Sequence, residues 1–193
     1  HPKELGKQAK ELGYDAIALT EHAGLYGAIE LYEAAEKAGV KPIIGVEANV
    51  AKDKHTDKRA GIDSRSTHIT LLAENNQGYQ NLLKLVSIAY LDGFYYKPRI
   101  DKDLMREYGE GIICLSGCGR GELAAAAKDH DDEKGLELIK IYQDAFGKEN
   151  FFIELVQRPE SPTQIEINEQ LIAWSKQTGQ PMVPTYTVPF VDA

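Results

Sequence analysis

The stretch AKELGYDAIALTEH (residues 9–22) contains the unit that decides the fold: a helix-like segment, a glycine, a short apolar run and a metal-ligating side chain. The unit returns as AEKAGVKPIIGVE (35–47) and REYGEGIICLSGC (106–118). The glycine precedes the last side chain by nine, eight and nine residues. Glycine just beyond a helix ends it, and an apolar run of about seven residues is typical of a buried strand. The pattern predicts an α/β fold of repeated helix–strand units.

A side chain that can bind a metal closes each unit: His22, Glu47 and Cys118. In closed βα barrels, side chains at the carboxyl ends of the strands build the active site. Parallel strands would therefore place these three residues at one rim. His68 opens a further apolar run, HITLLA (68–73), and completes the candidate set.

Imidazole, carboxylate and thiolate groups all bind Zn²⁺, and mixed histidine and carboxylate sets also suit Mn²⁺ or Fe²⁺. The sequence separations match no compact finger motif, so the prediction depends on placement at strand ends. Each residue also has a structural alternative. A carboxylate at a strand end is often solvated, a lone histidine is often hydrogen-bonded in the core, and a cysteine can be a small buried apolar residue.

The rest of the chain continues the alternation and predicts a barrel or an open α/β sheet in a single domain, 1–193. Polar residues 52–67 interrupt it and indicate an exposed loop, in which His55 has no evident partner. Helices are expected over 2–12, 28–38, 76–91, 101–109, 119–128, 134–146 and 162–177, and strands over 14–20, 40–47, 68–73, 111–116, 151–155 and 181–188.

Composition narrows the class of protein. The 193 residues carry a formal net charge of −8, which argues against strong nucleic-acid binding by this chain alone. The two cysteines, Cys114 and Cys118, share one strand-like stretch and favour a reducing, cytosolic compartment. No apolar run approaches the length of a membrane span.

Three stretches resemble one known family. LTEHAGLYGAIELYEAAEKAGVKPIIGVEANVA (19–51), HITLLAENNQGYQNLLKLVSIAYLDGFYYKPRID (68–101) and GIICLSGCGRGEL (111–123) are similar to the PHP (polymerase and histidinol phosphatase) domain of bacterial DNA polymerase III alpha subunits. The resemblance implies a distorted (β/α)7 TIM-like barrel, here without its first strand. It also implies polymerase palm, thumb and fingers domains after residue 193.

The resemblance implies a site that, when intact, binds up to three metal ions and in some members of the family supports 3′–5′ exonuclease or phosphatase activity. Matched by position, His22, Glu47, His68 and Cys118 correspond to family metal ligands. Glu21 stands where the family usually has aspartate.

Two departures weaken the implied site. The last strand of the family ends in a motif with an aspartate and a histidine ligand, and this chain has Thr187 and Pro189 at those positions. The family's His-x-His motif is also absent from the sequence. The resemblance therefore leaves two outcomes for the cofactor, a divalent metal (Zn, Mn or Fe) or none.

Three basic residues near the inferred rim, Lys97, Arg99 and Arg120, are candidates for phosphate contact because guanidinium groups match phosphate oxygens. Structural salt bridges are the alternative. The first functional hypothesis is a PHP domain with a degenerate site that stabilises a replicative polymerase and supports docking of a proofreading exonuclease subunit. The alternatives are an active metal-dependent phosphoesterase acting on 3′ nucleotides or pyrophosphate, and a stand-alone phosphatase acting on a small phosphomonoester, against which GFYYKPRID argues.

Overall fold

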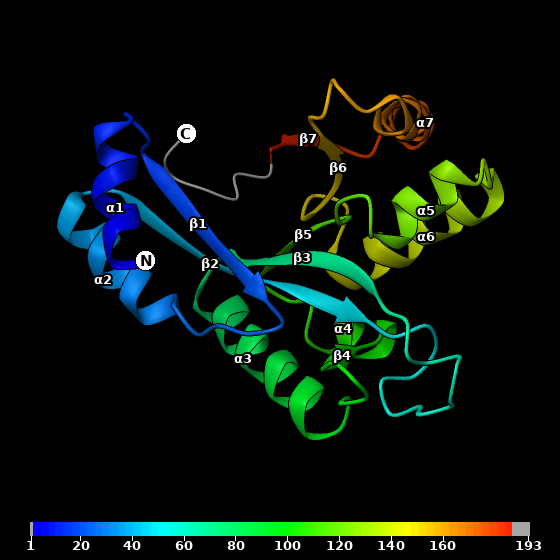
Figure 1. Ribbon diagram of the computed structural model, residues 1–193, viewed down its shortest axis with the longest axis horizontal. Helices are drawn as coiled ribbons and strands as arrows, with labels where there is room; N and C mark the ends of the chain where they lie inside the picture. Colours follow the sequence, from blue (N-terminus) through cyan, green and yellow to red (C-terminus); the bar gives the residue numbers. More distant parts are fainter. Residues whose placement is uncertain (1, 187–193) are drawn as a thin grey trace.

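A curled mixed sheet with helices around its outer side dominates the computed structural model, which describes residues 2–186 (Figure 1). The described strands follow the order β1-β2-β3-β5-β6-β7, and the short β4 pairs with β2. The sheet forms a half-barrel. The elements in chain order are α1 (Pro2–Glu11), β1 (Ala16–His22), α2 (Ala28–Ala38), β2 (Lys41–Val50), β3 (Thr67–Ala73), α3 (Asn76–Leu91), β4 (Arg99–Ile100), α4 (Lys102–Glu107), β5 (Ile112–Leu115), α5 (Glu122–Lys128), α6 (Asp132–Phe146), β6 (Phe151–Val156), α7 (Pro162–Thr178) and β7 (Met182–Thr185).

One strand, β3, runs antiparallel to its neighbours, and so departs from the parallel pairing that repeated helix–strand units produce. β1 and β2 are parallel, as are β5, β6 and β7, but β3 is antiparallel to both β2 and β5. The link from β2 to β3 holds no helix. A parallel neighbour needs a crossover connection, usually through a helix, whereas a chain that simply turns back pairs antiparallel.

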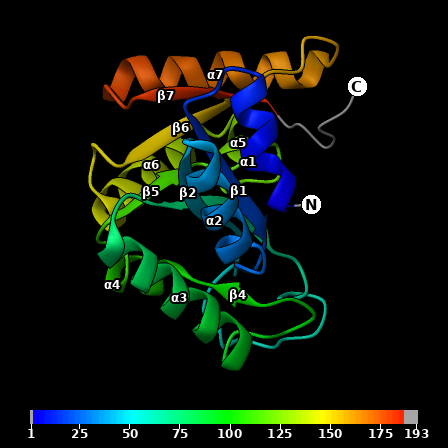
Figure 2. The same ribbon diagram turned by 90° about the vertical axis from the view of Figure 1, so that its left-hand side faces the viewer.

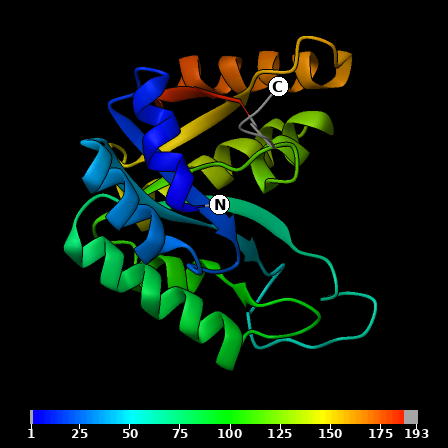
Figure 3. The same ribbon diagram turned by 60° about the vertical axis from the view of Figure 1, so that its left-hand side comes forward.

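The helices divide into groups along the sheet. α1 and α2 lie together at the β1 end, and α5, α6 and α7 lie at the β6 and β7 end (Figure 2, Figure 3). The local signals predicted from sequence operate as expected. Gly39 follows α2 in the left-handed region at φ 68°, and the Asp101 side chain accepts a hydrogen bond from Leu104 N to cap α4.

The outer face of the sheet carries the main apolar core. Val46 and Ala48 of β2, Ile69 of β3, and Phe151 and Ile153 of β6 are all buried in one cluster with residues of α3 to α7. Successive side chains of a strand point to opposite faces. The residues that alternate with these core positions therefore face the inner, concave side.

The predicted exposed loop is organised around one buried arginine. Arg99 is 1% exposed and donates hydrogen bonds to the carbonyl oxygens of Gly93, Asp63, His55 and Asp57 at 2.7–3.1 Å. His55 does have a partner, because its Nδ1 lies 2.6 Å from Asp101 Oδ2. Residues 55–63 are therefore tied to the strand β4 by long-range contacts, which no local pattern in the sequence indicates.

Candidate metal centre

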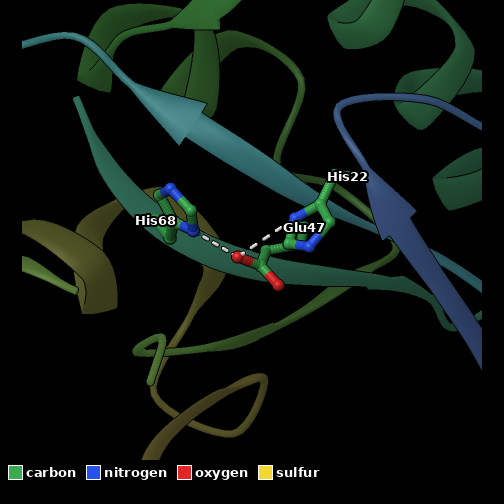
Figure 4. A group of neighbouring side chains, drawn as sticks. All are labelled: His22, Glu47 and His68. Carbon is green, nitrogen blue, oxygen red and sulfur yellow. Dashed lines mark hydrogen bonds and ion pairs between the residues drawn. The ribbon is translucent and has the colours of Figure 1, made fainter. Parts of the chain in front are cut away.

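Three predicted ligands meet on the concave side of the sheet. His22, Glu47 and His68 each offer a ligand atom, and these atoms lie within 4.8 Å of one another. Figure 4 shows both imidazole rings directed at one oxygen of Glu47. His22 Nδ1 lies 3.4 Å from Glu47 Oε1, and His68 Nδ1 is hydrogen-bonded to the same oxygen.

Strand register explains the convergence. His22 ends β1 and lies directly opposite Glu47 in the parallel β1–β2 pair. His68 is the second residue of β3, and the antiparallel β2–β3 pair sets it opposite Asn49, two residues beyond Glu47. The start of an antiparallel strand meets the ends of its neighbours at the same rim. The reversed direction of β3 therefore brings His68 to the site.

Glu47 is held in its charged form. The hydrogen bond with His68 lowers the pKa of Glu47, burial raises it, and nearby His22, His68 and Arg120 lower it further, so that the net shift is downward. The three side chains differ in access: His22 is 75% exposed, Glu47 23% and His68 7%. The site has a buried histidine at its base and an open one at its edge.

Cys118 and Arg120 lie in the turn that follows β5, beside His68. The backbone N–H of His68 donates to Arg120 O at 3.1 Å. Gly117 has φ 86°, and a Cβ at this position would lie 2.3 Å from His68 O. Only glycine suits such a close approach in the left-handed region. The turn thus packs on His68. Cys118 Sγ is not one of the ligand atoms that lie within 4.8 Å of one another, so the role of Cys118 as a metal ligand stays a prediction.

The remaining predicted site residues have separate positions. Lys97 is exposed in the turn before β4, and Arg120 is exposed beside the cluster, where its charge lowers the pKa of Glu47. Phosphate contact by these two residues stays a prediction. The donors of Arg99 are directed to backbone carbonyls in the interior, which leaves its guanidinium little to offer a phosphate. Thr187 and Pro189 lie outside the described residues.

Two acidic residues near the site, Glu154 and Glu21, lie outside the predicted ligand set. Glu154 of β6 is 8% exposed, and one of its carboxylate oxygens has no hydrogen-bond partner among the described residues. In the strand FFIEL, Glu154 alternates with the core residues Phe151 and Ile153, and this spacing indicates that it faces the opposite, concave side. Glu21 Oε2 accepts from Gly27 N at 2.7 Å and so holds the turn before α2.

A second acidic group already holds a cation of the chain itself. Asp53, Asp57 and Asp63 have oxygens within 4.8 Å of one another. The Arg59 guanidinium lies 2.5, 3.5 and 2.8 Å from their carboxylates in that order. This cluster is therefore an ion-pair network of the loop.

The donor set of His22, Glu47 and His68 fits a divalent cation. Two imidazoles and one carboxylate form the set that zinc, manganese and non-heme iron sites use, with further positions left for water or substrate. The pKa of Glu47 is already lowered, so this carboxylate is ready to bind a cation near neutral pH.

Comparison with known proteins gives the family. The model of the PHP domain matches residues 1–158. The chain is 44% identical over 176 residues to the DNA polymerase III subunit alpha of Borreliella burgdorferi, covering 91% of this chain and 15% of that protein. It is 42% identical to the corresponding subunit of Thermus aquaticus, covering 88% of this chain and 14% of that protein. The chain thus spans about a seventh of the length of these relatives.

Solved structures agree on the fold. A putative metal-dependent phosphoesterase from Bifidobacterium adolescentis aligns with a TM-score of 0.57 at 15% identity, covering 98% of this chain and 82% of that one. An amidohydrolase from Chromobacterium violaceum with bound sulfate aligns with a TM-score of 0.57 at 14% identity, covering 98% and 81%. No described helix is long and apolar enough to cross a membrane. The family match covers most of the chain, and we conclude that the chain belongs to the PHP domain family.

Proposed function

We propose that the chain is the PHP domain of a bacterial replicative DNA polymerase in the cytoplasm, and that it holds a divalent cation, Zn, Mn or Fe, between His22, Glu47 and His68. The similarity to polymerase alpha subunits over nine-tenths of the chain supports the polymerase context. The convergence of three ligand atoms within 4.8 Å is the observation that carries the cation site.

In this role the cation stabilises the domain, and the domain supports the polymerase chain and the docking of a proofreading exonuclease subunit. The three ligands come from β1, β2 and β3. A cation bound to all three would add a further link between strands that backbone pairing and the contacts of Glu47 with His22 and His68 already join. Binding to the folded state alone stabilises it by about 2.7 kcal/mol when the free ion is at 100 times its dissociation constant.

Thermal unfolding of the full chain tests this role. The midpoint of wild type should rise with added Mn²⁺ or Zn²⁺ and fall with a chelator. The variant His22→Ala should respond much less, because it lacks the exposed ligand of the cluster. Equal responses of the two proteins would contradict a stabilising cation at this site.

A second candidate, a metal-dependent phosphoesterase acting on 3′ nucleotides or pyrophosphate, is favoured by the open edge of the cluster. His22 is 75% exposed, and the exposed Arg120 acts electrostatically on Glu47. A divalent cation supplies Lewis-acid stabilisation for phosphoryl transfer. In this chain, Glu47 and the two histidines would hold it, and Arg120 would bind a phosphate oxygen.

The test for this candidate is release of nucleotides from the 3′ end of single-stranded DNA by the full chain with Mn²⁺. Activity should be lost in Glu47→Gln and reduced in Arg120→Met. The control Glu122→Gln makes the same chemical change at a carboxylate that instead accepts from Tyr142 at 2.8 Å. Activity that persists in Glu47→Gln would arise elsewhere and would contradict this candidate.

A further inference from the structure

Glu154 is a buried carboxylate whose hydrogen bonding is incomplete. Its Oε1 accepts a hydrogen bond from Thr185 Oγ1 at 2.7 Å. Its Oε2 has no hydrogen-bond partner among the described residues, and the side chain is only 8% exposed. A buried carboxylate oxygen without a partner is costly, so the Oε2 atom of Glu154 calls for an explanation.

The position of Glu154 places it on the concave face of the sheet, which also carries the cluster of His22, Glu47 and His68. In β6, the neighbouring Ile153 belongs to the outer core, so alternation turns Glu154 to the concave face. In β2, the same argument applies to Glu47, which lies between the core residues Val46 and Ala48. Burial raises the pKa of Glu154, and the charge of Glu47 on the same face raises it further.

Within residues 2–186, no basic side chain pairs with Glu154. Among the described residues, Glu154 forms no salt bridge, and the Thr185 hydroxyl and the Gly117 N–H are the groups that lower its pKa. Gly117 belongs to the turn that packs on His68. Glu154 therefore lies between this turn and β7, on the concave face. A cation bound there would offset the negative charges of Glu154 and Glu47 and would give Glu154 Oε2 a partner.

We propose that Glu154 is a further carboxylate ligand of the cation site, at a position adjacent to the three-residue cluster. Its oxygens do not belong to the group of ligand atoms that lie within 4.8 Å of one another. Glu154 would therefore bind a cation at a separate position, beside that group and nearer to β6 and β7. Carboxylate oxygen favours a hard ion such as Mn²⁺ at this position. The inference rests on the proposed cation site and adds a ligand that the resemblance did not supply.

A ligand at Glu154 would compensate for two family ligands that the resemblance expects on the last predicted strand and that this sequence lacks. Thr187 and Pro189 provide neither a carboxylate nor an imidazole. Glu154, on the strand that pairs with β7, provides an anionic group. A site that lacks those two ligands would then keep a charged oxygen donor from β6.

Titration of the full chain with Mn²⁺, followed by the electron paramagnetic resonance signal of the free ion, tests the proposal. Glu154→Gln keeps the size of the side chain and removes its charge. We expect the Mn²⁺ dissociation constant to rise by about 10- to 100-fold. In the presence of chelator, the thermal midpoint of Glu154→Gln should equal or exceed that of wild type, since the variant no longer buries an acid beside Glu47.

The control Glu122→Gln should bind Mn²⁺ as wild type does, because Glu122 bonds to Tyr142 and Lys102 on the outer side. An unchanged dissociation constant in Glu154→Gln, or an equal loss in the control, would overturn the role of Glu154 and leave the three-residue site standing. Failure of wild type to bind Mn²⁺ saturably would contradict the cation site itself and this inference with it.

Discussion

Glu47 of β2 and His68 of β3 are hydrogen-bonded through Oε1 and Nδ1, although the strand register sets Thr70, and not His68, directly opposite Glu47. The bond is a diagonal across an antiparallel pair, a distance that long side chains can span. It fixes the carboxylate between two imidazoles, because His22 approaches the same oxygen from β1.

The first prediction concerns this shared carboxylate. Glu47→Gln removes the only carboxylate of the three-residue cluster, and we expect the affinity for Zn²⁺ or Mn²⁺ to fall by about 100-fold or more, beyond the loss typical of outer groups. Isothermal titration of the full chain measures it. Glu122→Gln is the matched control, and affinity retained in Glu47→Gln would show that the ion binds elsewhere.

The second prediction concerns the turn beside His68. Gly117→Ala should weaken metal binding and destabilise the fold by about 1–3 kcal/mol, because it adds strain at positive φ and pushes on the His68 carbonyl. Gly119→Ala is the control, since the nearest atom to its added Cβ is Gln164 Oε1, at 3.5 Å. Denaturant unfolding reports the difference, and equal stability of the two variants would refute the close packing.

The third prediction concerns the buried arginine. Arg99→Met leaves four carbonyl oxygens without their donor and should cost about 3 kcal/mol or more in the free energy of unfolding. Arg106→Met removes an exposed arginine that, among the described residues, pairs with Asp103, and it should change the free energy of unfolding by about 0.5 kcal/mol at most. If Arg99→Met were as mild as its control, the loop would not depend on this side chain.

The fourth prediction concerns pH. Hydrogen bonds from Arg59 lower the pKa of Asp63 from its ordinary 3.8 to about 2, although burial opposes them. A carboxyl group whose pKa is lower in the folded state than in the unfolded state stabilises the fold fully at pH values above its unfolded-state pKa. This stabilisation is lost as the pH falls through the folded-state pKa. Asp63→Asn should therefore be less stable than wild type at pH 7, and the difference should shrink from about pH 4 toward pH 2. Unfolding curves at several pH values measure it, and a constant difference would contradict the ion pair.

Much of the fold could be predicted because its signals are local. The range of α3 follows from its apolar spacing, and the ends of α2 and α7 follow from Gly39 and Gly179, both in the left-handed region. The direction of β3 could not be predicted in this way, since pairing depends on how the chain returns after the loop of residues 51–66. The helix-free character of that loop was the signal for a reversal.

The site was predictable in part for the same reason. The ends of strand-like runs pointed to His22 and Glu47, the start of the run HITLLA pointed to His68, and these three side chains lie close together. Arg99 could not be placed, because an arginine beside a predicted rim gives no sign that four backbone carbonyls will surround it. His55 and Asp101 pair across 46 residues, which no local pattern reports.

Metal content per chain is the most direct test of the central claim, measured by elemental mass spectrometry on protein purified without chelator and on His22→Ala. The proposed site predicts near-stoichiometric Zn, Mn or Fe in wild type and much less in the variant. Wild-type protein that holds no metal, even after reconstitution with each ion, would contradict the claim that His22, Glu47 and His68 form a cation site.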